Sequence, residues 1–293
     1  MATKMKKKGL YYQIVIGALL VVYALIMASL FYFTFVNSCK DPWGFIQDAV
    51  GLPEQWFFLE NYETIILKLK MQANVKAPIY YIEDMFLGSL GYAMLSAGGI
   101  VIATTMVAYA CVQFPNFKMS SVMYFLAMFV ITVPIVGSLP SEMQVIRGLG
   151  FYNQLWSAFI LKFTFGNIYF LLLYEAIKGI PKDYKEAAQV DGASQLRVML
   201  QIMLPMVKNV IGSIFLIQFI AFWNDYSTPL IYMPSVPNIS VGVMSFAFST
   251  KGEIAYEPYK LAACLVVMLP ILAVFIVFQK TLLGSISEGG IKG

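Results

Sequence analysis

Long apolar runs, separated by short polar segments, dominate the pattern along the chain. A helix needs about 20 mostly apolar residues to cross a hydrocarbon core about 30 Å thick. Several runs reach that length with one charged residue or none. The pattern therefore predicts an all-α, multi-pass membrane protein with six transmembrane helices. The predicted spans are 10–36, 86–114, 119–140, 151–177, 206–233 and 261–280.

Two apolar stretches are ambiguous. The first follows a lysine-rich start, as a secretory signal does, but it is about twice as long as the roughly 7–15 apolar residues of a signal core. We expect it to be retained as the first span. The stretch after Asp225 is long enough for a seventh helix, but three prolines interrupt it. Because proline lacks a backbone donor and breaks helices, we expect a loop there.

The positions of Lys and Arg predict the direction of the spans. If the N-terminus is cytoplasmic, most of the basic residues fall on the cytoplasmic side and most of the acidic residues fall outside. An excess of Lys and Arg in cytoplasmic segments is the general rule. We therefore expect both termini inside, with cytoplasmic segments at 1–9, 178–205 and 281–293. The long outer loops are then 37–85 and 234–260.

Composition excludes several other classes of protein. The chain is 59% hydrophobic and only 12% charged, with a mean hydropathy of +0.73, whereas soluble domains carry about 25% charged residues. Histidine is absent, which removes histidine acid–base chemistry and histidine metal sites. The chain also has no phosphate-binding G-x-x-x-x-G-K-[ST] motif. We expect no catalytic residue, metal site or cofactor in this chain, and a net charge of +4 is too small for a nucleic-acid partner.

Two sets of small side chains are expected to be buried. A stripe of small residues spaced by four on the second span lets another helix approach closely, and a packing face is a simpler explanation than a gating surface. The three cysteines share no CxxC-type spacing, so we expect buried apolar roles for them rather than disulfides or a metal cluster. These residues are Ser89, Ala93 and Ala97, and Cys39, Cys111 and Cys264.

The cytoplasmic segment 178–205 predicts two short helices joined by a sharp bend. Pro181 suits the start of the first helix, and Gly192 can adopt the left-handed conformation that ends it. Ser194 can cap the second helix, and Pro205 marks the end of that helix before the fifth span. From patterning alone, such a unit rests on the lipid surface or is held by a soluble partner.

The same segment carries a longer motif. It resembles the E-A-A…G…L-P signature of binding-protein-dependent ABC import permeases, and its extended form is similar to the carbohydrate-importer branch, the MalG-type permeases. Stretches that begin at residues 51, 60, 223 and 229, and the final Lys-Gly, resemble that branch too. The motif residues are Glu186, Ala187, Ala188, Asp191, Gly192, Leu204 and Pro205.

The resemblance implies a fold, a membrane and a set of partners. The fold would be that of a type I ABC importer, with the E-A-A coupling loop between the fourth and fifth helices, in a bacterial cell membrane. The partners would be a second homologous permease subunit in a heterodimer, two ATPase subunits that bind ATP and Mg, and an extracytoplasmic sugar-binding protein. Glu186 would anchor the loop to the ATPase, and the tail at 287–293 would insert between the ATPase subunits. The outer loop at 235–259 would enter the binding protein and displace its sugar.

Residues inside the predicted spans are candidates for the sugar pathway. Sugars are bound by hydrogen-bonding side chains and aromatic faces, and a charge inside a membrane is costly enough to be a functional candidate. Lys162 is expected near the middle of the fourth span, where it would pair with an acid, line the cavity, or pack against backbone carbonyls. A cluster on the fifth span is either a sugar contact or an interfacial aromatic belt. The cluster is Trp223, Asn224, Asp225 and Tyr226.

These expectations favour the transmembrane permease subunit of an ATP-driven, solute-binding-protein-dependent sugar importer. An ABC importer for a non-sugar solute would carry the same E-A-A signature. An ion-coupled secondary transporter is a third interpretation, but the chain shows no evident internal repeat and few intramembrane charges. A membrane enzyme is the least favoured because the chain lacks histidine.

Overall fold

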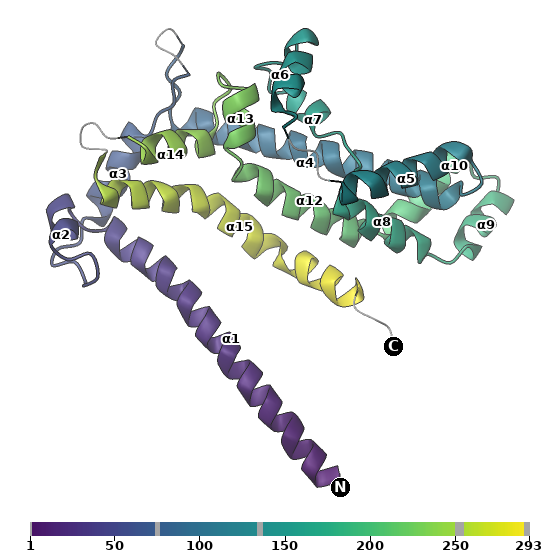
Figure 1. The fold of residues 1–293 in the computed structure, drawn as a ribbon, viewed down its shortest axis with the longest axis horizontal. Coiled ribbons are helices and arrows are strands. Elements are labelled where there is room, and N and C mark those ends of the chain that lie inside the picture. The colour runs from purple at the N-terminus through teal and green to yellow at the C-terminus, as the bar shows by residue number, and fades with distance from the viewer. Residues whose placement is uncertain (1, 74–76, 134–136, 250–254, 290–293) are drawn as a thin grey trace. The chain divides into compact units, whose positions relative to one another are not determined.

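The computed structural model describes residues 2–73, 77–133, 137–249 and 255–289. Over these residues the secondary structure is helical, apart from an isolated antiparallel bridge between Met71 and Tyr80 (Figure 1). The expected all-α class is confirmed. Two compact units are present: Met1–Leu69 with Ser245–Met268, and Lys70–Met244 with Leu269–Gly293.

The first unit contains helix α1, Ala2–Ser38, and a small folded segment at its end. Apolar side chains of α1 are exposed along most of its length from residue 12, as expected for a span that faces lipid. Helix α2, Pro42–Gln47, and helix α3, Phe58–Lys68, follow. Asn61 of α3 donates hydrogen bonds of 2.8 Å to the carbonyl oxygens of Ser38 and Lys40, which fixes the segment to the end of α1.

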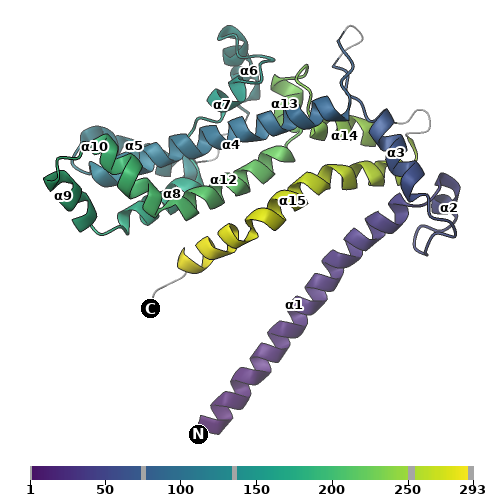
Figure 2. The ribbon, with the colours of Figure 1, turned by 180° about the vertical axis from the view of Figure 1, so that it is seen from behind.

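The second unit is built around helix α4, Ile82–Gln113. Helix α12, Lys208–Trp223, and helix α8, Ile168–Lys178, pack along it, as both views show (Figures 1 and 2). Glycines of α4 permit close approach: a Cβ at Gly88 would lie 1.9 Å from the Pro237 carbonyl oxygen. Long apolar side chains on α12 and α8 fill the remaining space against α4.

The stripe of small residues on α4 is buried as predicted. Ser89, Ala93 and Ala97 are all fully shielded from solvent. Ser89 also accepts a hydrogen bond of 2.8 Å from the backbone N–H of Ile239, so this face packs on the start of a further helix. The small side chains on α4 let the backbone at Ile239 approach closely enough to donate to the Ser89 hydroxyl.

The remaining helices are mostly short. They are α5 Lys118–Thr132, α6 Leu139–Gly148, α7 Ser157–Leu161, α9 Asp183–Val190, α10 Gln195–Val198, a π-helix Met199–Met203, α11 Leu204–Met206, α13 Ser227–Tyr232, α14 Ile239–Ala247 and α15 Glu257–Gly289.

The number of spans stays a prediction. Among the described residues, three helices are long and apolar enough to cross a membrane: Tyr12–Ser38, Ile82–Gln113 and Glu257–Gln279. The bent pair Gln195–Met206 and Lys208–Trp223 makes a fourth if it is counted as one span. Helix α5 alone is too short, and part of the predicted third span, residues 134–136, lies outside the described residues.

The predicted fourth span is not one helix. Helix α7 ends at Leu161, Lys162 follows it, and α8 begins only at Ile168. The side chain of Asn167 accepts a hydrogen bond of 3.0 Å from the backbone N–H of Tyr169 and so caps α8. The expectation that Lys162 lies in the middle of a continuous helix is therefore wrong, because a cap starts a new helix five residues later.

The predicted fifth span is also interrupted. Helix α12 ends at Trp223, and the side chain of Asp225 accepts hydrogen bonds of 2.9 Å from the Ser227 hydroxyl and 3.1 Å from the Thr228 N–H. These bonds satisfy donors at the start of α13, as an N-cap does. The sequence predicts Asp225 as a charge inside a span, but in the structure it lies just before a separate helix, α13.

The prediction of a loop after Asp225 is also wrong, because the segment forms helices α13, Ser227–Tyr232, and α14, Ile239–Ala247. The Asn238 side chain accepts a hydrogen bond of 3.1 Å from the Val241 N–H and caps α14, directly after Pro237. Pro229 lies in the first turn of α13, and Pro234 and Pro237 precede α14, so the prolines do not prevent helices here. In the segment 234–260, which is predicted to be an outer loop, residues 250–254 lie outside the described residues, as do residues 290–293 of the predicted tail.

The cysteines divide into two groups. Cys39 and Cys111 are buried, as expected. Cys264 is exposed, so that prediction is wrong. Its neighbours Ala263 and Leu265 face the interior of the fold, which places Cys264 on the opposite side of α15.

Candidate functional site: a cavity with charged side chains and an exposed two-helix loop

Residues 178–205, predicted to be cytoplasmic, fold locally as their sequence predicts. Helix α9 ends at Val190, and Gly192 adopts a φ of +80°, where a side chain would strain the backbone. The hydroxyl of Ser194 then accepts a hydrogen bond of 3.3 Å from the Arg197 N–H and caps α10. The left-handed glycine and the serine cap therefore set the bend between the two helices, as expected.

The E-A-A residues lie on the surface of this bend. Glu186, Ala187 and Asp191 are exposed, whereas Ala188 is buried against the rest of the loop. Val190 is 88% exposed, which is unusual for a valine in a folded segment. The loop therefore presents an acid beside an apolar side chain. The coupling roles of its residues stay predictions.

A π-helix and a sharp bend connect this loop to α12. In the π-helix Met199–Met203 the hydrogen bonds run five residues back instead of four. This widening accommodates Pro205, which has no N–H to donate and whose ring needs space on its N-terminal side. Helix α11 and α12 meet at Val207, and the two halves of the pair are bent by 75°. The predicted end of the helix at Pro205 falls two residues before this break.

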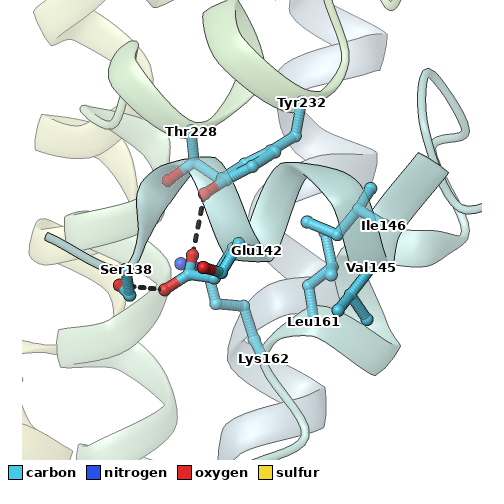
Figure 3. Close-up of a pocket in the computed structure, with 9 residues that line it drawn as sticks. Ser138, Glu142, Val145, Ile146, Leu161, Lys162, Thr228 and Tyr232 are labelled. Atoms are coloured by element: carbon cyan, nitrogen blue, oxygen red, sulfur yellow. Dashed lines mark hydrogen bonds between the residues drawn. The ribbon is translucent and has the colours of Figure 1, made fainter. Parts of the chain in front are cut away.

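A cavity of about 400 Å³ lies in the second unit, where three short segments meet (Figure 3). One wall comes from α6 and the residue before it, a second from the end of α7, and a third from α13. Ligand sites in proteins occupy about 300–1,000 Å³. The lining residues are Ser138, Ser141, Glu142, Val145, Ile146, Leu161, Lys162, Thr228 and Tyr232.

Glu142 is held in place by two hydroxyl groups. The Ser138 hydroxyl donates to one carboxylate oxygen, and the Tyr232 hydroxyl donates to the other at 2.8 Å (Figure 3). These hydrogen bonds, with a smaller contribution from the charge of Lys162, lower the pKa of Glu142 below its ordinary value. Glu142 is therefore an ionised acceptor of fixed orientation at neutral pH.

Lys162 provides the cavity with a donor. Its amino group lies 5.3 Å from the centre of the Phe222 ring and faces the charges of Asp225 and Glu142. Within the part of the chain that the structure describes, no hydrogen bond or ion pair joins this amino group to another residue. Of the arrangements expected for Lys162, the structure shows exposure to the cavity, and shows neither a direct pair with Asp225 nor bonds to backbone carbonyls.

Asp225 lies behind the cavity wall. Besides its bonds to the start of α13, it accepts a hydrogen bond of 2.8 Å from the hydroxyl of Tyr92 on α4. Three donors from two elements therefore fix this carboxylate. It joins the break between α12 and α13 to the central helix of the unit.

The other predicted pathway residues do not line the cavity. Trp223 is 1% exposed and packs against Phe86, with ring centres 5.4 Å apart, so it is a core residue in this conformation. Asn224 donates a hydrogen bond of 2.9 Å to the Ile220 carbonyl oxygen of its own helix. Tyr226 is exposed outside the cavity. Of the five candidates, only Lys162 is a lining residue.

Sequence reasoning missed the polar residues that share the cavity with Lys162. They come in pairs spaced by four on short helices or at their ends, Ser138 with Glu142 and Thr228 with Tyr232. Spacing by four places two side chains on one face of a helix. That spacing was the available signal, and it is weak in segments that read as loop or span.

Exposed apolar helices, with a cavity that carries charged and hydroxyl groups where two helices are interrupted, are typical of a membrane transporter. Helices are broken at membrane depth only where the free backbone is buried in protein or lines a cavity. The family comparison agrees. The model of the family described as "Binding-protein-dependent transport system inner membrane component" matches residues 99–287, and the chain belongs to this family. It is therefore a membrane component of a transport system.

Relatives and a solved structure extend this result. The chain is 26% identical to the diacetylchitobiose uptake system permease protein NgcG of Streptomyces coelicolor, over 93% of this chain and 86% of that one. It is 26% identical to the sulfoquinovosyl glycerol transport system permease protein SmoH of Agrobacterium fabrum, over 82% of each chain. A chain of a bacterial ABC transporter that imports the acidic polysaccharide alginate has a TM-score of 0.75 at 19% identity, covering 92% of this chain and 95% of that one. The expected type I importer fold is confirmed.

Proposed function

We propose that this chain is the transmembrane permease subunit of an ATP-driven, solute-binding-protein-dependent importer of a sugar or oligosaccharide. It forms half of the pathway, and a second homologous permease subunit forms the other half. Relatives whose names give sugars as their cargo support a sugar over a non-sugar solute. The family and the exposed loop support a bacterial cell membrane with both termini cytoplasmic.

The observation that carries this proposal is the cavity at two helix breaks. Lys162 follows the end of α7, and Thr228 lies at the start of α13, so both interruptions border the same space. Discontinuous helices at the substrate site are typical of transporters, because unwound backbone and helix ends supply polar groups there. A sugar passing through this half of the pathway would meet hydroxyl, carboxylate and ammonium groups.

The exposed loop provides a coupling surface for an ATPase subunit. The carboxylate of Glu186 and the exposed apolar side chains of Val190 and Leu196 lie on adjacent helices of one bend. An acid beside apolar side chains suits a cleft with a basic residue on the partner. Two such partners would bind ATP and Mg, and the 75° bend at Val207 would carry their movement to α12.

Reconstitution tests this function directly. The chain alone in liposomes is expected to show neither ATP hydrolysis nor sugar flux, whereas the assembly with a second permease, two ATPase subunits and the binding protein is expected to show both. The Glu186→Ala variant should remain in the membrane but lose most of the co-purifying ATPase. Sugar uptake by the single chain would contradict the proposal and favour an ion-coupled transporter.

A further inference from the structure

The charged groups of the cavity differ in how many hydrogen-bond partners they have. Both carboxylate oxygens of Glu142 accept hydroxyl hydrogens from the protein, yet each oxygen keeps a further lone pair. The ammonium group of Lys162 has three donors and, among the described residues, no acceptor. The cavity therefore offers a ligand the free donors of Lys162 and the spare acceptor capacity of Glu142.

Three ligand chemistries complement this arrangement to different extents. A hydroxyl group both donates and accepts, so neighbouring hydroxyls of a sugar can accept from Lys162 and donate to Glu142. A carboxylate or sulfonate can only accept and would satisfy Lys162 alone. An ammonium can only donate and would satisfy Glu142 alone. A neutral polyhydroxyl ligand can use both groups without bringing a further charge to the site.

The charges around Lys162 also favour a neutral ligand. Lys162 faces two carboxylates, Glu142 in the cavity and Asp225 behind its wall, and both are fixed by hydrogen bonds. The three charges together leave one net negative charge at the site. An anion close enough to bind Lys162 would be repelled by both carboxylates. Since the carboxylates cannot turn away without losing their donors, this repulsion is built into the fold.

We propose that this cavity selects an uncharged sugar, read by Lys162 and Glu142 together, and that it rejects anionic sugars such as uronates. This inference rests on the proposed function, because it names the substrate class of the same pathway. The fold itself does not decide the charge of the cargo, since a structure of the same fold belongs to an importer of an acidic polysaccharide. The local charges of this chain decide it.

The potential of the cavity can be measured without knowing the sugar. Ser141 lines the cavity and is exposed, so Ser141→Cys, in a chain whose three native cysteines are changed to Ser, places a thiol there. Gln144→Cys on the same helix is the matched control, since Gln144 is exposed but outside the cavity lining. Vesicles that contain the whole importer are treated with a cationic and an anionic methanethiosulfonate reagent of similar size.

We expect the cationic reagent to be favoured in the Ser141→Cys variant by roughly tenfold relative to the Gln144→Cys control. Adding Glu142→Gln should lower this ratio several-fold, and adding Lys162→Met should raise it. Preference for the anionic reagent, or a ratio that Glu142→Gln leaves unchanged, would overturn the proposal. Both added substitutions keep side-chain size, and correct membrane insertion is checked by labelling at the control position.

Uptake separates this inference from the proposed function. The assembled importer is offered neutral disaccharides (maltose, cellobiose and diacetylchitobiose) and uronic-acid disaccharides derived from pectin and alginate. Import of a neutral sugar with exclusion of the uronates is expected, and import of a uronate would overturn the inference while leaving the importer function intact. If no sugar of either class is imported, the proposed function fails and the inference fails with it, whatever the reagent ratio shows.

Discussion

Replacing Gly99 with alanine should displace one wall of the cavity from a distance. A Cβ at Gly99 of α4 would lie 2.4 Å from the carbonyl oxygen of Phe159 and 3.2 Å from its carbonyl carbon. Real Cβ contacts are not found under 3.0 Å, so α7 must move away from α4. Because Phe159 lies three residues before Lys162, the shift is transmitted to the amino group in the cavity.

The size of the effect follows from two opposed contributions. Alanine is about 1 kcal/mol more favourable than glycine inside a helix. Forcing an extra methyl group into a packed contact costs about 1–3 kcal/mol, and here the obstacle is backbone, which cannot rotate aside. The net expectation for Gly99→Ala is a loss of up to about 2 kcal/mol in stability, together with reduced uptake.

The adjacent glycine is the control. A Cβ at Gly98 meets nothing within 4 Å, so Gly98→Ala should be neutral or stabilising. Thermal unfolding of the purified protein in detergent, and sugar uptake by the assembled importer, are measured for both variants. If Gly99→Ala is as stable and as active as Gly98→Ala, the close packing of α7 on α4 is refuted.

Three further perturbations test the predicted coupling loop, the carboxylate of Asp225 and the carboxylate of Glu142. Gly192→Ala should strain the loop by about 1–2 kcal/mol and weaken ATPase co-purification, whereas Gly192→Asn should retain most of it; equal loss in both would contradict the role of the +80° φ. Tyr92→Phe removes one of three donors to Asp225 and should cost about 1.5–3 kcal/mol in thermal unfolding, and an unchanged midpoint would argue against this bond. Glu142 lies outside the predicted spans, and its lowered pKa stabilises the fold above the ordinary carboxyl pKa of about 4.3. That contribution should disappear as the pH falls through the lowered pKa. Below about pH 4.3, the free energy of unfolding of the wild type should therefore change more steeply with pH than that of Glu142→Gln. Parallel pH profiles would show that the two hydroxyl bonds do not hold this carboxylate.

Features set by local chemistry could be predicted from the sequence. The positive φ of Gly192, the cap at Ser194 and the buried stripe at Ser89 each depend on a few neighbouring residues. Apolar length alone identified α1, α4 and α15. In these regions local propensity and the hydrophobic pattern agree, which is why the prediction succeeded.

Features that depend on distant segments could not be predicted. The interruption after α7 was missed, because the break at residues 162–167 is short, carries a single charge and lies between two apolar stretches. Trp223 reads as an exposed aromatic in a polar cluster, but packing against Phe86 of another helix buries it. Glu142 reads as an acid in a loop, and only the fold brings the Tyr232 hydroxyl to it from 90 residues away.

The central claim is that the cavity belongs to the sugar pathway, and Lys162→Met tests it most directly. Lys178→Met is the control, since Lys178 is exposed and pairs with Glu175 on the surface. Uptake is measured in proteoliposomes with the assembled importer, at saturating ATP and saturating sugar-loaded binding protein. We predict that Lys162→Met lowers the maximal uptake rate by roughly tenfold, the value of one lost charge-assisted hydrogen bond, while the control retains it. If Lys162→Met imports sugar with unaltered kinetics, Lys162 is a tolerated charge and the cavity is not the pathway.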